Sequence, residues 1–410
     1  MSSTSQVFII IGGGLAGAKA AQALRDNDFD GHIVLFGTEE QLPYERPPLS
    51  KDYLVGKKSL DEFTVNPSSW YRDQHIDLRL GTEIVAINPK AHTVTLQNGA
   101  TEHYDKLLLA MGSRSRRPPI PGSDAEGVHY LRTVDDADAL LSALPDGSSL
   151  AVVGAGWIGL EVAAGARERG VDVTVVESAE LPLLAALGRE AAEVFAALHR
   201  EHGVDLRLSS EVDEITTDGV KATGLKLAGG STVPADAVLV AVGAKANVDL
   251  ADDAGLELGD GGILVDASLQ TSDPDIYAVG DLAAAEHPLL GVRIRTEHWA
   301  NALKQPAIAV AGMLGKPAAY DELPYFFTDQ YDLGMEYVGH APDYDSAVFR
   351  GDVDKREFTV FWLDRANRVL AGMNVNIWDG LDDIKALIRS RSSVDPVRLA
   401  DPKYAIGGNA

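Results

Sequence analysis

The feature that most restricts the fold of this sequence is a glycine-rich segment that occurs twice. At its first occurrence, the apolar residues 7–11 (VFIII) lead directly into residues 12–17 (GGGLAG), which open an alanine-rich stretch over residues 16–25. In a strand–turn–helix unit of this spacing, the first glycine makes the turn, the second lets phosphates approach, and the third lets helix and strand pack closely. We therefore predict a buried strand, a helix and a pyrophosphate site at the helix N-terminus.

The second occurrence, residues 154–159 (GAGWIG), lies between a predicted strand over residues 150–153 and a predicted helix over residues 158–169. The next predicted strand ends at Glu177, about 20 residues after the first glycine, where a carboxylate accepts the ribose hydroxyls of adenosine and repels a 2′-phosphate. A solvated strand end is the plainer alternative for Glu177, but the spacing favours the ribose contact. The next three residues include no arginine to bind such a phosphate, so the sequence predicts NADH rather than NADPH.

The corresponding acidic residue is missing after the first glycine segment. Gly37 follows the second predicted strand (residues 32–36), and Glu39 and Glu40 come after it. Either glutamate can make the ribose contact, and the sequence leaves the choice open. Two fingerprints need two dinucleotides, and the economical assignment is a permanently held FAD in the first and NADH in the second.

Short β-branched runs alternate with helical stretches along most of the chain, which predicts an α/β fold with parallel sheets. Further buried strands are expected over residues 104–110, 236–241 and 276–279, and an antiparallel pair over residues 358–362 and 369–377. We predict two Rossmann-like domains of the glutathione-reductase type and a C-terminal α+β domain. Their predicted bounds are 1–113 with 243–320 for FAD, 114–242 for NADH, and 321–410 for the C-terminal domain.

The composition excludes several classes of function. The formal net charge of −25 over 410 residues argues against nucleic acid and anionic membrane surfaces as partners. Because the chain has no cysteine, it carries no disulfide or iron–sulfur cluster, and we expect no metal site. The apolar residues 7–24 have the composition of a signal peptide, but no lysine or arginine precedes them, and a strand–turn–helix explains their glycines. We expect a cytoplasmic protein without a membrane span.

Six motifs occur in order along the chain: residues 12–17, 46–51 (RPPLSK), 110–112 (AMG), 154–161, 277–281 (YAVGD) and 297–302 (EHWANA). Together they resemble the NADH-dependent ferredoxin reductases of cytochrome P450 and Rieske dioxygenase systems, the family of putidaredoxin reductase and biphenyl dioxygenase ferredoxin reductase. The resemblance covers nearly the whole chain. It implies an enzyme that passes electrons from NADH through FAD to a [2Fe–2S] ferredoxin, which feeds a cytochrome P450 or a Rieske oxygenase.

The motifs and the resemblance together assign the site residues. Those expected to bind FAD are Gly12, Gly14, Ala16, Gly17, Gly37, Arg46, Lys51, Val85, Ala110, Gly112, Arg132, Gly280, Asp281, Glu297, His298 and Trp299. Those expected to bind NADH are Gly154, Gly156, Ile158, Gly159, Glu161, Glu177 and Gly243. The resemblance implies that Lys51 and Glu161 pair beside the isoalloxazine as the catalytic pair, where a positive charge favours the reduced anionic flavin. Phe327 departs from the family pattern, because some relatives have a tryptophan there.

Several of these residues also have plainer explanations. Asp281 follows a glycine at the end of a predicted strand, so its carboxylate can bind the flavin ribityl hydroxyls, cap a following helix, or do both. Trp299 can stack near the flavin or fill the core. Lys51 and Glu161 can be two unrelated solvated charges, although buried charges need partners.

Without cysteines, electrons must leave the flavin directly for an external acceptor, and a [2Fe–2S] centre takes one at a time. An acidic chain does not attract an acidic ferredoxin at long range, so docking requires a local basic patch. Arg293, Arg295 and Lys304 are our candidates; ordinary surface charges are the alternative. Two other functions stay open: a rubredoxin reductase or NADH oxidase using small acceptors, and a redox-responsive flavoprotein like apoptosis-inducing factor.

Overall fold

The computed structural model describes residues 6–407, and its contacts divide the chain into two compact units. Unit 1 consists of the chain up to residue 46, residues 60–114 and residues 244–324. Unit 2 consists of residues 47–59, residues 115–243 and the chain from residue 325 onward. The loop over residues 47–59, which the sequence prediction grouped with residues 1–113, therefore belongs to unit 2. The three-domain division stays a prediction.

Unit 1 contains a five-stranded parallel sheet in the order β20-β7-β1-β2-β3. Its strands are β1 (Val7–Ile11), β2 (His32–Phe36), β3 (Ile76–Arg79), β7 (Lys106–Leu109) and β20 (Ile276–Ala278). The strands β1, β7 and β20 are buried along almost their whole length, as expected for parallel strands that are covered on both faces. The turn after β1 lies at the carboxyl edge of the sheet, where open α/β sheets bind ligands.

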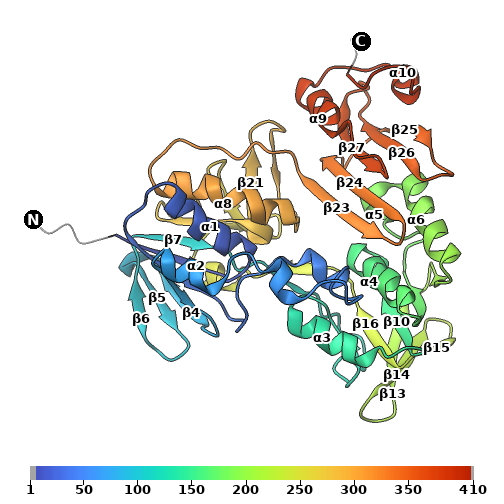
Figure 1. The fold of residues 1–410 in the computed structure, drawn as a ribbon, viewed down its shortest axis with the longest axis horizontal. Helices are drawn as coiled ribbons and strands as arrows, with labels where there is room; N and C mark the ends of the chain where they lie inside the picture. The colour runs from blue at the N-terminus through green and yellow to red at the C-terminus, as the bar shows by residue number, and fades with distance from the viewer. Residues whose placement is uncertain (1–5, 408–410) are drawn as a thin grey trace, which may run out of the picture. The chain divides into compact units, whose positions relative to one another are not determined.

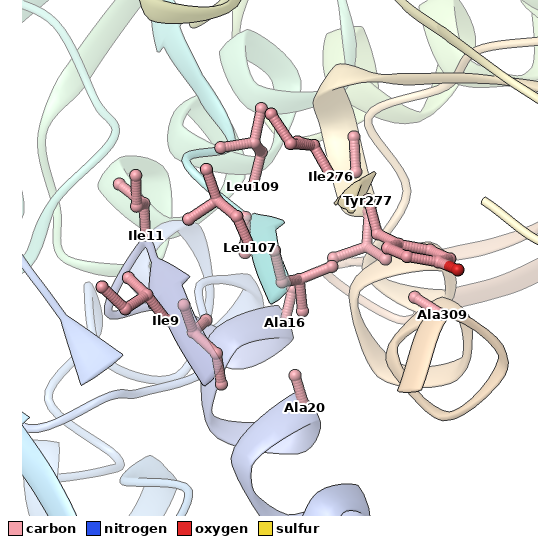
Figure 2. Packing of buried hydrophobic residues seen from close by; sticks show 14 of the residues in the cluster. Ile9, Ile11, Ala16, Ala20, Leu107, Leu109, Ile276, Tyr277 and Ala309 are labelled. Carbon is pink, nitrogen blue, oxygen red and sulfur yellow. The ribbon is translucent and has the colours of Figure 1, made fainter. Parts of the chain in front are cut away.

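The core of unit 1 joins this sheet to two helices, α1 (Leu15–Asp26) and α8 (Trp299–Met313). Figure 2 shows side chains of β1, β7 and β20 gathered with the alanines of α1 and α8. In register, Ile9 and Ile11 of β1 lie opposite Leu107 and Leu109 of β7. Alanines on α1 and α8 present little bulk, which lets the two helices pack against each other and onto the sheet.

The remaining elements of unit 1 form two small sheets and several short helices. The first sheet is an antiparallel meander of β4 (Ile84–Asn88), β5 (Thr93–Leu96) and β6 (Thr101–His103). The second has the order β18-β19-β21-β22 and consists of β18 (Leu258–Gly259), β19 (Gly262–Val265), β21 (Ala283–His287) and β22 (Val292–Ile294). The short helices are α2 (Ser68–Asp73), α7 (Asp249–Asp253) and the 3₁₀ helices η2 (Leu60–Phe63), η3 (Pro89–Ala91) and η4 (Gly280–Leu282). Strands β8 (Ser113–Ser115) and β17 (Ala244–Ala246) lie where the chain passes between the units.

Unit 2 repeats the parallel topology in a second five-stranded sheet, in the order β12-β11-β10-β16-β9. Its strands are β9 (Val128–His129), β10 (Ser149–Val153), β11 (Asp172–Val176), β12 (Asp205–Arg207) and β16 (Ala237–Val240). Its helices are η1 (Pro47–Ser50), α3 (Val134–Ala143), α4 (Trp157–Glu168), α5 (Leu184–Leu187) and α6 (Arg189–Glu201). A three-stranded sheet of β13 (Val212–Thr217), β14 (Ala222–Leu227) and β15 (Thr232–Pro234) adjoins them.

The C-terminal part of unit 2 is an antiparallel sheet in the order β23-β24-β27-β26-β25 (Figure 1). Its elements are β23 (Tyr325–Gln330), β24 (Leu333–Gly339), β25 (Ser346–Asp352), β26 (Glu357–Leu363), β27 (Val369–Val375), α9 (Leu381–Ser390) and α10 (Pro396–Ala400). The predicted antiparallel pair is β26 and β27. The buried indole of Trp362 donates a hydrogen bond to the Leu187 carbonyl at 3.1 Å, which ties this sheet to the helices of the second parallel sheet.

The sequence prediction of an α/β fold with two Rossmann-like sheets is confirmed. Bounds differ by a residue or two; the helix predicted over residues 16–25, for example, is α1 (Leu15–Asp26). The 3₁₀ helix η1 in the proline-rich loop is one of the elements that were not predicted; it forms because the prolines preset the backbone angle of a tight turn. Within residues 6–407, no helix is long and apolar enough to span a bilayer.

Candidate functional site

The first glycine turn contains one glycine that the chain itself does not require. A Cβ atom on Gly12 would lie 2.2 Å from the Ala110 carbonyl oxygen, and one on Gly17 would lie 2.0 Å from the carbonyl oxygen of Gly12. A Cβ on Gly14 would meet nothing within 4 Å, and its φ of −96° suits any residue. Gly14 caps α1 without a side-chain hydrogen bond, so first-turn N–H groups remain for a ligand.

The second glycine turn repeats this arrangement. Cβ atoms on Gly154 and Gly159 would lie 2.6 Å and 2.2 Å from backbone carbonyl oxygens, whereas one on Gly156 would meet nothing within 4 Å. Gly156 caps α4, again without a side-chain hydrogen bond. At both turns, no contact within the described chain requires the middle glycine, whereas the close approach of a phosphate would require it. The residues present therefore fit a phosphate-bearing dinucleotide at each helix N-terminus.

Glu177 is fixed against the second turn. Its Oε2 accepts a hydrogen bond from the backbone N–H of Ala155 at 2.7 Å, and its Oε1 accepts one from the N–H of Ala179 at 2.8 Å. Because Ala155 lies inside the glycine turn, the carboxylate at the end of β11 is held beside the proposed nucleotide site. This is the geometry expected of a ribose acceptor.

Replacing Glu177 by alanine is expected to lower the preference for NADH over NADPH by about 10- to 100-fold. This is the effect of losing the hydrogen bonds between the ribose hydroxyls and a charged carboxylate. The measurement is kcat/KM with each cofactor. Glu180→Ala is the matched control, because the Glu180 carboxylate lies on the same loop but pairs with Arg189. An unchanged ratio in Glu177→Ala would remove Glu177 from the nucleotide site.

Around the first turn, Glu39 is already engaged. Its Oε1 lies 2.7 Å from Nη2 of Arg46, and its Oε2 lies 2.5 Å from the hydroxyl of Tyr44. Glu40 is exposed. Gly37 lies so close to Gly13 that a Cβ on it would be 3.1 Å from the Gly13 Cα atom, so this glycine serves loop packing. Both glutamates stay candidates for the ribose contact.

Asp281 lies buried in η4 and accepts a hydrogen bond from Ser113 Oγ at 2.6 Å. The element after η4 is the strand β21, so the alternative that Asp281 caps a following helix is wrong. Beside it, the Gly280 N–H donates to Oε1 of the buried Gln305 on α8 at 2.7 Å. Gln305 was not predicted from the sequence, because a lone glutamine within a helical pattern carries no motif.

The motif over residues 297–302 (EHWANA) spans the start of helix α8. Glu297 is exposed, His298 is the N-cap residue, and Trp299 is the first helical residue. The Trp299 indole N–H lies 3.1 Å from Oε2 of Glu45, and the side chain is half-buried. Trp299 is therefore not a core residue, and an amphipathic ring with a polar contact suits a ligand wall.

The other predicted residues divide between the units. Ala16, Val85, Ala110 and Gly112 lie in unit 1 with the first turn, whereas Arg132 lies in unit 2, just before α3. Gly243 and Ile158 lie in unit 2 with the second turn. Val85 and Ile158 are 44% and 43% exposed, a high value for apolar side chains that suits ligand contacts. The ligand roles of all these residues stay predictions.

A buried ion pair lies in unit 2, between the loop after η1 and helix α4. Lys51 Nζ is 2.7 Å from Oε1 of Glu161, and the two side chains are only 13% and 4% exposed. Thr328 on β23 donates to Oε1 of Glu161 at 2.6 Å, and Ser50 donates to its Oε2. Both residues of the pair belong to unit 2, because residues 47–59 are grouped with residues 115–243. Ser50 and Thr328 were not predicted from the sequence as partners of Glu161.

The predicted docking residues make more hydrogen bonds and ion pairs within the protein than surface charges usually do. Arg293 and Arg295 each donate to two backbone carbonyls and one carboxylate. Their side chains are 24% and 18% exposed. Lys304 is 42% exposed and lies 3.3 Å from Glu322. Among the three, Lys304 is the most available to a partner.

His199 is a wholly buried histidine on α6, with Nε2 2.9 Å from Oε1 of Gln330. Burial lowers its pKa from 6.5 to about 4, and the neighbouring His202 adds to this effect. The folded protein therefore holds His199 neutral over a pH range in which the unfolded chain would protonate it.

A pH dependence of stability follows. Because the folded pKa lies below the unfolded one, the contribution of His199 is complete above pH 6.5 and is lost as the pH falls toward 4. Between pH 7 and pH 4.5, the wild type is expected to lose about 2 to 3 kcal/mol more unfolding free energy than His199→Gln. Urea unfolding at both pH values measures this difference. Equal losses in the two proteins would contradict the prediction.

Comparison with known proteins gives consistent matches along the chain. Residues 7–306 match the family described as pyridine nucleotide-disulphide oxidoreductase, and residues 325–407 match the reductase C-terminal family. The chain is 42% identical over 395 residues to the 5,5′-dehydrodivanillate O-demethylase ferredoxin reductase subunit of a Sphingobium species, covering 96% of this chain and 95% of that protein. It is 41% identical over 399 residues to the ferredoxin–NAD(+) reductase component of the anthranilate 1,2-dioxygenase system of Burkholderia cepacia, covering 97% and 98%. Among solved structures, the covalent putidaredoxin reductase–putidaredoxin complex matches with a TM-score of 0.94 and 35% identity, covering 98% of this chain and 97% of that one.

Proposed function

Because the chain belongs to the pyridine nucleotide-disulphide oxidoreductase family, we propose that it is an FAD-dependent NADH:ferredoxin oxidoreductase. The chain is an oxidoreductase that uses FAD and NAD(H). Two observations carry the proposal: each of two glycine turns has a middle glycine with open space where a phosphate would approach, and no cysteine is present to receive electrons. An external acceptor must therefore take them.

The ferredoxin acceptor is supported by the relatives. One is named the ferredoxin reductase subunit of an O-demethylase, and another is named the ferredoxin–NAD(+) reductase component of a dioxygenase system. The similar solved structure is a complex of putidaredoxin reductase with putidaredoxin. We extend this to a [2Fe–2S] ferredoxin that feeds a cytochrome P450 or a Rieske oxygenase. A cytoplasmic location belongs to the proposal, because the first apolar segment is the buried strand β1.

When bound, FAD supplies the conversion of a two-electron hydride donor into two one-electron transfers. The chain's own residues would bind and orient the two dinucleotides. Gly14 and Gly156 leave room for the two pyrophosphates at the N-termini of α1 and α4, and Glu177 would hold the NADH ribose. Buried Asp281 would hold the ribityl chain, and Trp299 would contribute a wall of the flavin site.

Lys51 and Glu161 are the proposed catalytic pair. Lys51 would supply a positive charge to the isoalloxazine, and Glu161 holds that ammonium in one position. Such preorganised charge stabilises the developing negative charge of the reaction without reorganisation. No general acid–base triad is needed, because positioning and electrostatics carry the chemistry.

Anaerobic stopped-flow absorbance tests the proposal. The purified yellow protein is mixed with NADH or NADPH, and then with an oxidised [2Fe–2S] ferredoxin of the P450 type or of the Rieske type. Fast bleaching by NADH, followed by fast recovery as ferredoxin is reduced, is the expected result. Fast bleaching with a long-lived charge-transfer band and no ferredoxin reduction would instead favour a redox-responsive flavoprotein or a reductase that uses small acceptors. No bleaching would mean that the second glycine turn is misassigned.

Charge reversal at Lys304 tests the docking patch. Lys304→Glu is expected to raise the KM for ferredoxin several-fold and to weaken its salt dependence, because rim charges act mainly on association. Flavin reduction by NADH should not change. Arg293 and Arg295 are poorer probes, since their reversal also removes internal hydrogen bonds. Unchanged ferredoxin turnover in Lys304→Glu would place the docking patch elsewhere.

A further inference from the structure

We infer that His199 and Gln330 are positioning residues, which fix the Glu161 carboxylate through Thr328 and thereby fix the Lys51 ammonium. This inference rests on the proposed role of the Lys51–Glu161 pair. It concerns side chains behind the pair, on α6 and β23, for which the sequence showed no motif.

The hydrogen atoms in this chain of contacts have only one arrangement. Thr328 Oγ1 lies 2.6 Å from Oε1 of Glu161, and a carboxylate only accepts, so the Thr328 hydroxyl donates to it. Gln330 lies 3.2 Å from the same hydroxyl oxygen and must therefore present its Nε2 as the donor. Its Oε1 then faces His199 Nε2 at 2.9 Å, which requires a proton on that nitrogen. The charge of Glu161 thus sets the amide orientation and the histidine tautomer.

The contact between His199 and Tyr331, at the end of this series of hydrogen bonds farthest from Glu161, fits the same arrangement of hydrogen atoms. With Nε2 protonated in a neutral ring, Nδ1 of His199 is an acceptor, and the Tyr331 hydroxyl lies 3.5 Å from it. Burial raises the pKa of the Tyr331 hydroxyl, so it keeps its proton. The Tyr331 ring stacks on His202 with centroids 3.7 Å apart, which holds the hydroxyl in place.

Every member between Tyr331 and Glu161 is almost wholly buried: His199 is 0% exposed, and Gln330 and Thr328 are 1% exposed. Burying a polar group costs free energy unless the group is hydrogen-bonded. Apolar residues of the same size would fill this region equally well without needing hydrogen bonds. A fully satisfied polar chain instead specifies one arrangement. The amide of Gln330 does not pass a proton on without changing tautomer, so the chain orients Glu161 rather than conducting protons.

A matched pair of variants at one position tests the inference. His199→Leu keeps bulk and removes the donor to Gln330, whereas His199→Gln places an amide N–H near the former Nε2. Leu198→Ala is the packing control, because Leu198 is a buried neighbour on α6 outside the chain of contacts. All three are made in the full-length flavin-containing protein.

The first readout is the acetylation rate of Lys51 by acetic anhydride, followed by mass spectrometry and normalised to Lys57, which is 62% exposed. In His199→Leu, we expect Lys51 to react about tenfold faster, since a mobile Glu161 no longer pins the ammonium. In His199→Gln and Leu198→Ala, the rate should stay within about twofold of wild type. Equal Lys51 rates in His199→Leu and wild type would overturn the inference.

The second readout separates positioning from binding. In stopped-flow reduction, His199→Leu is expected to lower the limiting rate of flavin reduction about tenfold and to leave the NADH concentration at half-maximal rate nearly unchanged. An unchanged limiting rate with weaker NADH binding would count against positioning. If wild type itself is not reduced by NADH, the proposed function fails, whereas the acetylation result still decides the inference.

If His199→Leu does not fold, Thr328 provides the second test. Thr328→Val keeps the shape and removes the hydroxyl, while Thr328→Ser keeps the donor. Faster acetylation of Lys51 in Thr328→Val than in Thr328→Ser supports the inference, and equal rates contradict it.

Discussion

Replacing Gly14 by alanine is expected to give a folded protein that does not retain FAD. The added Cβ meets nothing within 4 Å in the chain, and the backbone at Gly14 is unstrained. It would, however, stand where the pyrophosphate must approach the N-terminus of α1. Absorbance near the flavin band after purification measures retained FAD, and circular dichroism measures folding. Loss of about 3 kcal/mol of binding free energy, about 100-fold in affinity, would leave the purified protein colourless or pale.

Two matched variants control this result. Gly12→Ala should destabilise the fold itself, because its Cβ would lie 2.2 Å from a carbonyl oxygen and its φ of +126° strains any side chain. Gly156→Ala should keep FAD and lose NADH binding, because Gly156 holds the same position in the second turn. Full FAD retention by Gly14→Ala would contradict the assignment of the first turn.

Replacing Glu161 by leucine is expected to lower the unfolding free energy by about 3 to 5 kcal/mol, because it leaves the Lys51 ammonium buried without its partner. Adding Lys51→Met should restore part of this loss, since apolar pairs often replace buried ion pairs without cost, whereas the buried Ser50 and Thr328 hydroxyls still lack the acceptor that Glu161 provided. Flavin reduction by NADH should nevertheless stay at least about 100-fold slower in the double variant, because the charge is missing. Denaturant unfolding and stopped-flow reduction measure the two effects separately.

The exposed pair Lys57–Glu168 is the control, with Nζ and Oε2 3.0 Å apart and side chains 62% and 37% exposed. Glu168→Leu should change the unfolding free energy by less than about 1 kcal/mol, because solvent screens such pairs. Restored reduction in the Lys51→Met/Glu161→Leu double variant would show that the pair serves stability alone.

The sequence predicted the fold well because its signals are local. A strand, a glycine turn and a helix lie within about 20 residues of each other, and each is set by periodicity and backbone freedom. The strand β1 and the helix α4 were therefore predicted nearly to the residue. Asp281 shows the limit of such reasoning: a glycine–aspartate pair after a strand also suits a helix cap, and only the following strand β21 decides between them.

The sequence by itself determined the two dinucleotide turns, the absence of cysteine chemistry and the resemblance to ferredoxin reductases, because each is written in neighbouring residues or in composition. Only the tertiary structure decided what surrounds Glu161. Ser50 and Thr328 reach its carboxylate from distant parts of the chain, and His199 stands behind Thr328 through Gln330. Such partners follow no spacing rule. Their selection depends on how α4, α6 and β23 pack, and burial then requires every polar atom in that packed region to find a partner.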